Sequence, residues 1–173
     1  MDNIFKSFRQ NTIIFIDGAN LFYAQKTLGI KIDYQKLYDF LHQYQRIIAI
    51  RIYLAFNHQS EKEKAFIYKL EKIGYIVVCK QLKIIQQNNK TVIKKGNLDI
   101  ELALDAFELQ AKYRTFVLFS GDSDFEVLLK RLKQKAKRCV VFSTRGHISR
   151  ELAYIANKYI EIDNLKVYIQ KSR

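Results

Sequence analysis

The sequence contains no proline, no tryptophan and only two cysteines among its 173 residues. Cys79 and Cys139 lie in separate apolar runs, and the three histidines, His42, His58 and His147, are scattered along the chain. These residues do not have the spacing of a zinc site, and two lone cysteines form no disulfide framework. Zinc-stabilised and disulfide-stapled folds are therefore excluded, and we expect both cysteines to be reduced residues of the core.

Long apolar runs and nucleotide-binding signatures are also missing. No segment approaches the roughly 18 consecutive apolar residues of a transmembrane helix, and the N-terminus lacks the apolar core of a signal peptide. We therefore expect a soluble, cytoplasmic protein. The turn Asp17-Gly18-Ala19-Asn20 lacks the G-x-G-x-x-G of dinucleotide-binding proteins, and no G-K-[ST] of a P-loop is present.

Acidic residues are scarce relative to basic ones. Lysine and arginine number 30 against 17 acids, which gives a formal net charge of +13 and a pI near 9.7. This excess favours a polyanionic partner, of which nucleic acid is the commonest and an acidic membrane surface the competing one. The 49% apolar content and the length predict one domain over residues 1–173, with a core from about 12 to 163.

Apolar runs with strand character alternate with segments of helical periodicity, which predicts an α/β fold with a parallel sheet and helices on both faces. Residues 83–95 interrupt this pattern with two short β-prone runs around an Asn-Asn-Lys turn, which predicts a hairpin. Residues 165–169 alternate like an edge strand or an arm. The predicted strands cover residues 12–16, 46–56, 75–82, 114–120, 138–142 and 159–163.

Carboxylates gather at the ends of predicted strands. Asp122 and Asp124 follow the strand 114–120, and Asp17 follows the first strand in the same way. Ligands of open α/β sheets bind at the carboxyl ends of strands, so these three aspartates would face one another if their strands are neighbours. A third acidic cluster contains Asp99, Glu101 and Asp105 in the first half of a helix predicted over residues 97–112. Asp99 and Asp105 are six positions apart and do not share a helix face, so we assign Asp99 to the site.

A structural explanation competes with this one. Ser123 and Glu126 have the spacing of a capping box, and Asp122 or Asp124 would stabilise a helix N-terminus through the helix dipole. The recurrence of carboxylates at three element boundaries in a basic chain is harder to explain by capping alone. Converging like charges repel unless a cation holds them together.

Three blocks of the sequence resemble those of the NYN domains, a branch of the PIN-like nucleases. The blocks are Phe15-Ile16-Asp17-Gly18-Ala19-Asn20, then Lys95-Gly96-Asn97-Leu98-Asp99, then Ser120-Gly121-Asp122-Ser123-Asp124-Phe125. The resemblance implies a three-layer PIN-like (Rossmann-like) fold, with a mainly parallel sheet of strand order 3-2-1-4-5. It also implies a metal-dependent ribonuclease with acidic residues at the positions of Asp17, Asp99, Asp122 and Asp124.

The residues and the resemblance together predict a metal-dependent endoribonuclease. The four aspartates would bind Mg²⁺ or Mn²⁺, since hard ions prefer oxygen ligands. We expect Asn20 and Ser120 to orient these groups, and Asp105 to support the site or to bind Lys95 or backbone. The RNA partner, single-stranded or structured, would contact basic and polar residues around the cleft, namely Lys90, Lys94, Lys95, Arg145 and Ser149.

Several alternatives stay open at this stage. An RNA-binding or regulatory module with little or no catalysis would have the same sequence features, and a phosphatase acting on small molecules would require less positive charge. The hairpin is either a finger over RNA or a solvated loop. The basic run 130–138 is either a phosphate-binding patch or a solvated helix end. The oligomeric state is also open, a homodimer included.

Overall fold

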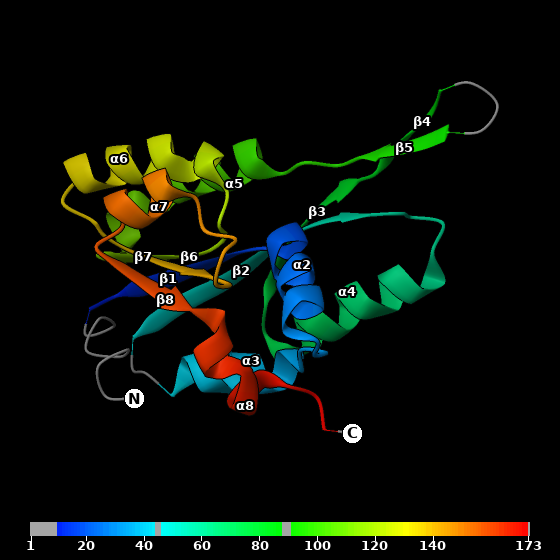
Figure 1. Cartoon of the computed structure of the whole chain (residues 1–173), viewed down its shortest axis with the longest axis horizontal. Coiled ribbons are helices and arrows are strands. Elements are labelled where there is room, and N and C mark those ends of the chain that lie inside the picture. The colour runs from blue at the N-terminus through cyan, green and yellow to red at the C-terminus, as the bar shows by residue number, and fades with distance from the viewer. Residues whose placement is uncertain (1–9, 44–45, 88–90, 173) are drawn as a thin grey trace.

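The protein consists of a parallel sheet with helices on both faces and an antiparallel hairpin (Figure 1). The computed structural model describes residues 10–43, 46–87 and 91–172, and for residues 84–87 and 91–95 it describes the backbone alone. The elements, in chain order, are β1 (Thr12–Asp17), α2 (Gly18–Leu28), α3 (Tyr34–His42), β2 (Ile47–Phe56), α4 (Glu61–Ile73), β3 (Ile76–Gln81), β4 (Lys83–Gln87), β5 (Thr91–Lys95), α5 (Asp99–Glu108), η3 (Leu109–Lys112), β6 (Thr115–Phe119), η4 (Ser123–Phe125), α6 (Glu126–Gln134), β7 (Arg138–Ser143), α7 (Arg150–Ile155), β8 (Lys158–Glu161), η5 (Ile162–Leu165) and α8 (Lys166–Ile169).

The six-stranded sheet has the order β3-β2-β1-β6-β7-β8, and each adjacent pair is parallel. This confirms the predicted order of the first five parallel strands and adds β8 at one edge. The chain moves outward from β1 in both directions, so β1 and β6 meet where the strand order reverses. In open α/β sheets this switch point is where ligands bind.

Alternating side chains of the central strands fill two apolar cores, one on each face of the sheet. Ile14 and Ile16 of β1 pack on the side of α2, α3, α4 and α8, whereas Ile13 and Phe15 pack on the side of α5, α6 and α7. Figure 1 shows these two helical layers above and below the sheet. Both faces of β1 are buried because a two-residue period directs successive side chains to opposite cores.

The hairpin of β4 and β5 confirms the prediction for residues 83–95 and leads directly into α5. Figure 1 shows it projecting away from the sheet beside the N-terminal end of α5. The prediction of a strand or arm at 165–169 was wrong, because this segment completes η5 and forms α8. Leu165 and Ile169 are four positions apart and both buried, which suits a helical turn as well as an alternating strand. Among the described helices, none is long and apolar enough to cross a membrane.

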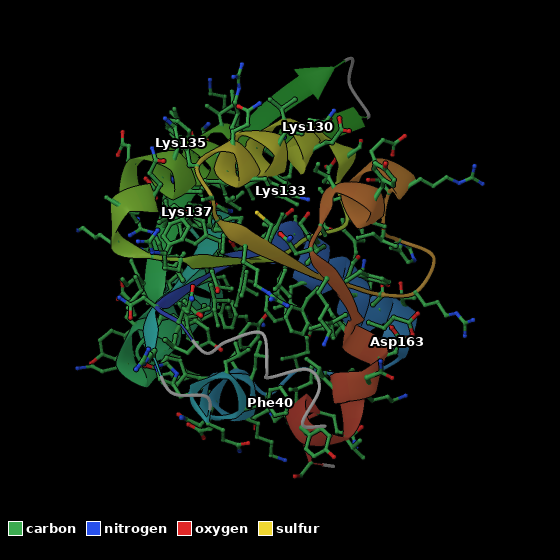
Figure 2. All side chains as sticks on the ribbon, turned by 90° about the vertical axis from the view of Figure 1, so that its left-hand side faces the viewer. Phe40, Lys130, Lys133, Lys135, Lys137 and Asp163 are labelled. Atoms are coloured by element: carbon green, nitrogen blue, oxygen red, sulfur yellow. The ribbon has the colours of Figure 1, made fainter. Side chains whose placement is uncertain are left out.

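The basic run at the end of α6 lies at the amino edge of the sheet, since Arg138 begins β7 beside Thr115 at the start of β6. Figure 2 labels four lysines of this run. Lys133 and Lys137 donate hydrogen bonds to the carbonyl oxygens of Ile155 and Tyr113 at 2.8 Å each. These lysines therefore anchor chain segments at the edge opposite the carboxyl ends of the strands, which favours the structural explanation of the run.

The two cysteines are unpaired, as predicted, but only one belongs to the core. Cys139 is fully buried on the central strand β7. Cys79 is exposed, which corrects the expectation that both are core residues. It lies on β3, which is an edge strand of the sheet and has no fully buried residue. The apolar run around Cys79 predicted burial, but an edge strand is covered less completely than an interior one.

Candidate active site

Asp17 ends β1 and connects three chain segments at the switch point. Its Oδ1 accepts hydrogen bonds from the backbone N–H groups of Ala19 (3.0 Å) and Asn20 (3.2 Å), so the carboxylate caps helix α2. Its Oδ2 accepts from the Asn20 side chain at 2.8 Å and from the Ser120 hydroxyl at 3.1 Å. The side chain is 9% exposed, so Asp17 lies behind the surface of the site.

The turn after β6 is attached to the same hydrogen-bond network. The N–H of Gly121 donates to Oδ1 of Asn20 at 3.1 Å, and the N–H of Asp122 donates to the Ser120 hydroxyl oxygen at 3.2 Å. A Cβ atom at Gly121 would collide with the carbonyl oxygen of His147, so only glycine allows the turn to pack against the loop after β7. Asn20 and Ser120 therefore connect the carboxyl ends of β1 and β6 through hydrogen bonds.

Asp122 and Asp124 project from this turn at the surface. Oδ1 of Asp122 accepts a hydrogen bond from the N–H of Asp124 at 3.1 Å, which caps the short helix η4. The capping explanation for this stretch is thus correct for Asp122. This hydrogen bond leaves the second oxygen of Asp122 and the carboxylate of Asp124 without a hydrogen-bond donor among the described residues.

Asp99 begins helix α5 and reaches the same place from the other side of the switch point. Its N–H donates to Oδ1 of Asn97 at 2.7 Å, and Nδ2 of Asn97 donates to its Oδ2 at 2.5 Å. Asn97 therefore fixes the orientation of the Asp99 carboxylate. Sequence reasoning did not assign this role to Asn97, although an Asn two residues before an Asp at a helix start is a signal for such a side-chain to backbone turn.

Asp99, Asp122 and Asp124 form a carboxylate cluster in which one oxygen of each lies within 4.8 Å of the others. Burial is the main cause that raises the pKa of Asp99; the Asn97 hydrogen bond opposes it, and the charges of Asp17, Asp122 and Asp124 raise the pKa further. The ion pairs formed by described side chains include none of these four aspartates. The structure thus brings the four predicted residues together, three as a cluster and Asp17 behind them.

The donor set of the cluster suits a hard divalent cation. All of its ligand atoms are carboxylate oxygens, and Mg²⁺ binds oxygen at about 2.0–2.1 Å, so its ligands can be at most about 4.2 Å apart. The separations of up to 4.8 Å are only slightly larger, which rotation of exposed carboxylates can close. A bound cation would also remove the repulsion among the aspartates.

Asp105 lies further along α5 and does not join the cluster. Its Oδ2 accepts hydrogen bonds from Nη2 of Arg51 at 2.7 Å and from the hydroxyl of Tyr53 at 2.9 Å. These partners lie on β2, whereas Lys95 or backbone was expected. Asp105 therefore anchors α5 to the sheet and supports the position of Asp99 indirectly.

The residues predicted to bind RNA have different positions. Lys90 lies outside the described residues, and Lys94 and Lys95 lie on β5, where the side chains are not described. Arg145 is exposed in the loop after β7, and its N–H donates to Asp163, a residue labelled in Figure 2. Ser149 caps α7, and its N–H donates to the Gly121 carbonyl oxygen at 2.9 Å. Ser149 thus supports the turn that carries Asp122.

Two open clefts flank the carboxylate cluster. One, of about 300 Å³, lies beside Asn97 at the base of the hairpin and is lined by Lys80, Gln81, Lys83, Gly96, Asn97, Ile100 and Glu101. The other, of about 290 Å³, adjoins Asp122 and is lined by Asn20, Tyr23, Lys26, Thr27, Gly121, Asp122 and His147.

The chain is similar to two curated proteins. The chain is 33% identical over 162 residues to the Low amplitude and bright protein LabA of Synechococcus elongatus, covering 92% of this chain and 87% of that protein. It is 26% identical to an uncharacterised protein of Methanocaldococcus jannaschii, covering 86% of this chain and 54% of that one.

Among solved structures, a protein of unknown function from Vibrio parahaemolyticus has the same fold. Its TM-score is 0.74 at 23% sequence identity, over 92% of this chain and 96% of that one. The family model of the NYN domain matches residues 11–163, which include β1, α5 and the turn after β6. The chain therefore belongs to the NYN domain family.

Proposed function

We propose that this protein is a metal-dependent endoribonuclease that hydrolyses phosphodiester bonds of RNA at the carboxylate cluster. The observation that carries the proposal is the convergence of Asp99, Asp122 and Asp124, within 4.8 Å and without an ion-pair partner in the described part of the chain. Such an arrangement is unfavourable unless a cation or a protonated group compensates for it.

The residues have distinct roles in this proposal. Asp99, Asp122 and Asp124 would hold Mg²⁺ or Mn²⁺, and Asp17 would add negative charge behind them. When bound, the ion would activate a water molecule and offset the charge of the scissile phosphate. Asn20 and Ser120 fix Asp17 and the Gly121 turn through the hydrogen bonds described above, and Asn97 fixes Asp99.

RNA is the proposed substrate because the surroundings of the cluster are basic and open. The net charge of +13 exceeds what a small anionic substrate requires. Lys83 lines one flanking cleft, in which Lys80 is ion-paired with Glu101, and Lys26 lines the other. The lysines of the hairpin, Lys90, Lys94 and Lys95, together with Arg145, are proposed to hold the RNA backbone outside the clefts.

The test is cleavage of a panel of RNAs and DNAs with Mg²⁺, with Mn²⁺ and with chelator. Asp122→Asn should lower the cleavage rate more than about 100-fold, because even residues that only support metal ligands contribute about 10- to 100-fold. Asparagine keeps the Oδ1 that caps η4, so folding should be preserved. Asp39→Asn, on the exposed surface of α3, removes the same charge away from the site and should leave cleavage unchanged.

Two results would contradict the proposal. Cleavage by Asp122→Asn at the wild-type rate would mean that the aspartates only cap helices. Metal-independent binding of RNA with no cleavage by the wild type would favour the alternative of an RNA-binding module with a PIN-like fold.

A further inference from the structure

The cleft beside Asp122 has a composition that the proposed metal chemistry does not explain. Helix α2 forms one wall, and the Gly121 turn and the loop after β7 form the other. Hydrolysis at the cluster requires carboxylates and an ion, whereas this cleft contributes an aromatic ring, an amine, a hydroxyl and an imidazole. Its volume of about 290 Å³ is at the lower end of ligand pockets, which span about 300–1,000 Å³.

The aromatic wall is exposed and held in place. Tyr23 is 62% exposed and its neighbour Phe22 is 52% exposed. The two rings meet edge to face with centroids 6.1 Å apart, and Nζ of Lys26 lies 4.7 Å from the Phe22 centroid and 5.5 Å from that of Tyr23. Cation–π contacts and the neighbouring ring restrict Tyr23, so it offers a preorganised flat surface to solvent.

Polar groups lie on both walls of the cleft. Oγ1 of Thr27 and Nε2 of His147 lie 3.2 Å apart in a hydrogen bond that joins α2 to the loop after β7. Both groups can donate or accept hydrogen bonds, as can the edges of nucleobases. An aromatic face with a nearby cation and a polar edge is the combination that proteins use to hold an unpaired base.

We propose that this cleft binds one unpaired nucleobase of the RNA strand, stacked on Tyr23, next to the phosphate at the carboxylate cluster. The inference rests on the proposed function for its substrate class. Asp122 belongs to both the cleft and the cluster, so a base in the cleft places its own backbone at the carboxylates. The enzyme would therefore select single-stranded RNA, because a paired base cannot stack on Tyr23.

The chain offers a matched control on α4. Tyr68 is 60% exposed and Nζ of Lys72 lies 5.1 Å from its ring centroid, so this pair has the same chemistry as Tyr23 and Lys26, although the lysine follows after four residues and not three. Tyr68 and Lys72 do not line the cleft. Any general effect of removing an exposed tyrosine beside a lysine is therefore measured at Tyr68.

The experiment measures binding, in chelator, of a short fluorescent single-stranded RNA and of the same strand with abasic sites. Tyr23→Ala should weaken binding of the normal strand about tenfold, which lies within the range for loss of one stacked base. Tyr23→Phe should bind like the wild type, and so should Tyr68→Ala. The abasic strand should bind wild type and Tyr23→Ala equally, and a free nucleoside monophosphate should compete only at far higher concentration than the strand.

The failures of the two proposals are separable. The base site is wrong if Tyr23→Ala binds the normal strand as tightly as the wild type does. It is also wrong if the substitution weakens binding of the abasic strand as much as binding of the normal strand. Both conclusions hold whatever the cleavage assays give. If the wild type binds no single strand, the base site is wrong as well. If Tyr23→Ala shows the selective loss while the wild type cuts no RNA in Mn²⁺, the base site stands and the nuclease proposal fails. Thermal melts of each variant verify folding, and Lys26→Ala supplies a second probe of the same cleft.

Discussion

Single residues at the switch point combine a structural role with a chemical one. Asp17 caps α2 and accepts a hydrogen bond from Ser120, and Asp122 caps η4 while it contributes to the cluster. Capping and metal binding are compatible because a carboxylate has two oxygens that can face different partners. The capping explanation is therefore correct for Asp122, and it is compatible with the metal site proposed above.

The two cysteines differ in environment, which gives a prediction at this scale. Burial raises the pKa of Cys139 to about 12, so at pH 8 its thiol stays protonated and unreactive, whereas Cys79 is exposed. A disulfide-exchange reagent at pH 8 should titrate one thiol in the native protein and both in denaturant.

Cys79→Ser is the control for this assignment and should abolish the native reaction while leaving the reaction in denaturant at one thiol. Rapid titration of both thiols in the folded protein would contradict the burial of Cys139.

At the scale of elements, α5 determines whether the cluster forms, because it carries Asp99 across to the turn after β6. The helix is attached to β2 through Asp105, whose partners Arg51 and Tyr53 are two residues apart on the strand. The Asp105 and Arg51 side chains are 28% and 20% exposed, so their ion pair is only partly screened by water.

Asp105→Asn should therefore destabilise the fold by about 1–2 kcal/mol, below the full value for a charged hydrogen bond because of that exposure. The melting temperature should fall by roughly 2–8 °C for a chain of this length. The comparison is Glu61→Gln, which removes the partner of Lys64 in a far more exposed pair on α4 and should change stability little. Equal effects of the two substitutions would mean that Asp105 does not anchor α5.

Sequence periodicity predicted the strands and the hairpin, because apolar spacing depends on local residues. The strand order that makes β1 and β6 neighbours, and so brings the aspartates to one place, came from the resemblance to the NYN domains. The pairing of Asp105 with Arg51 could not be predicted, since it joins residues 54 positions apart through the crossing of α5 over β2. The exposure of Cys79 could not be predicted either, because it results from the position of β3 at the edge of the sheet. Helix α8 was missed because an alternation over five residues fits a helical turn as well as a strand, and tertiary packing decides between them.

At the scale of the molecule, we predict that the carboxylate cluster makes stability depend on metal. Mutual repulsion of the aspartates destabilises the folded state, and a cation that binds only this state stabilises it by mass action. At a metal concentration 100 times the dissociation constant the gain is about 2.7 kcal/mol, which should raise the melting temperature by roughly 5–10 °C.

Thermal melts in chelator and in millimolar Mn²⁺ measure this shift. Asp122→Asn removes a ligand and a repulsive charge together, so it should melt at or above the wild type in chelator and gain little from Mn²⁺. Asp39→Asn should respond to Mn²⁺ as the wild type does. If the melting temperature of the wild type does not change with Mn²⁺, the cluster is not a metal site.

The hydrogen bond between Asp17 and Ser120 spans 103 positions of the chain. During synthesis, β1 emerges first and must wait for β6, and the Gly121 turn must then be packed by the loop after β7. Closing so long a loop costs entropy before any contact compensates, so we expect the site to form late in folding. A growing chain that has not yet produced β7 therefore has all four aspartates and no assembled site, and an RNA-cutting activity would be withheld from the message on which the chain is being made.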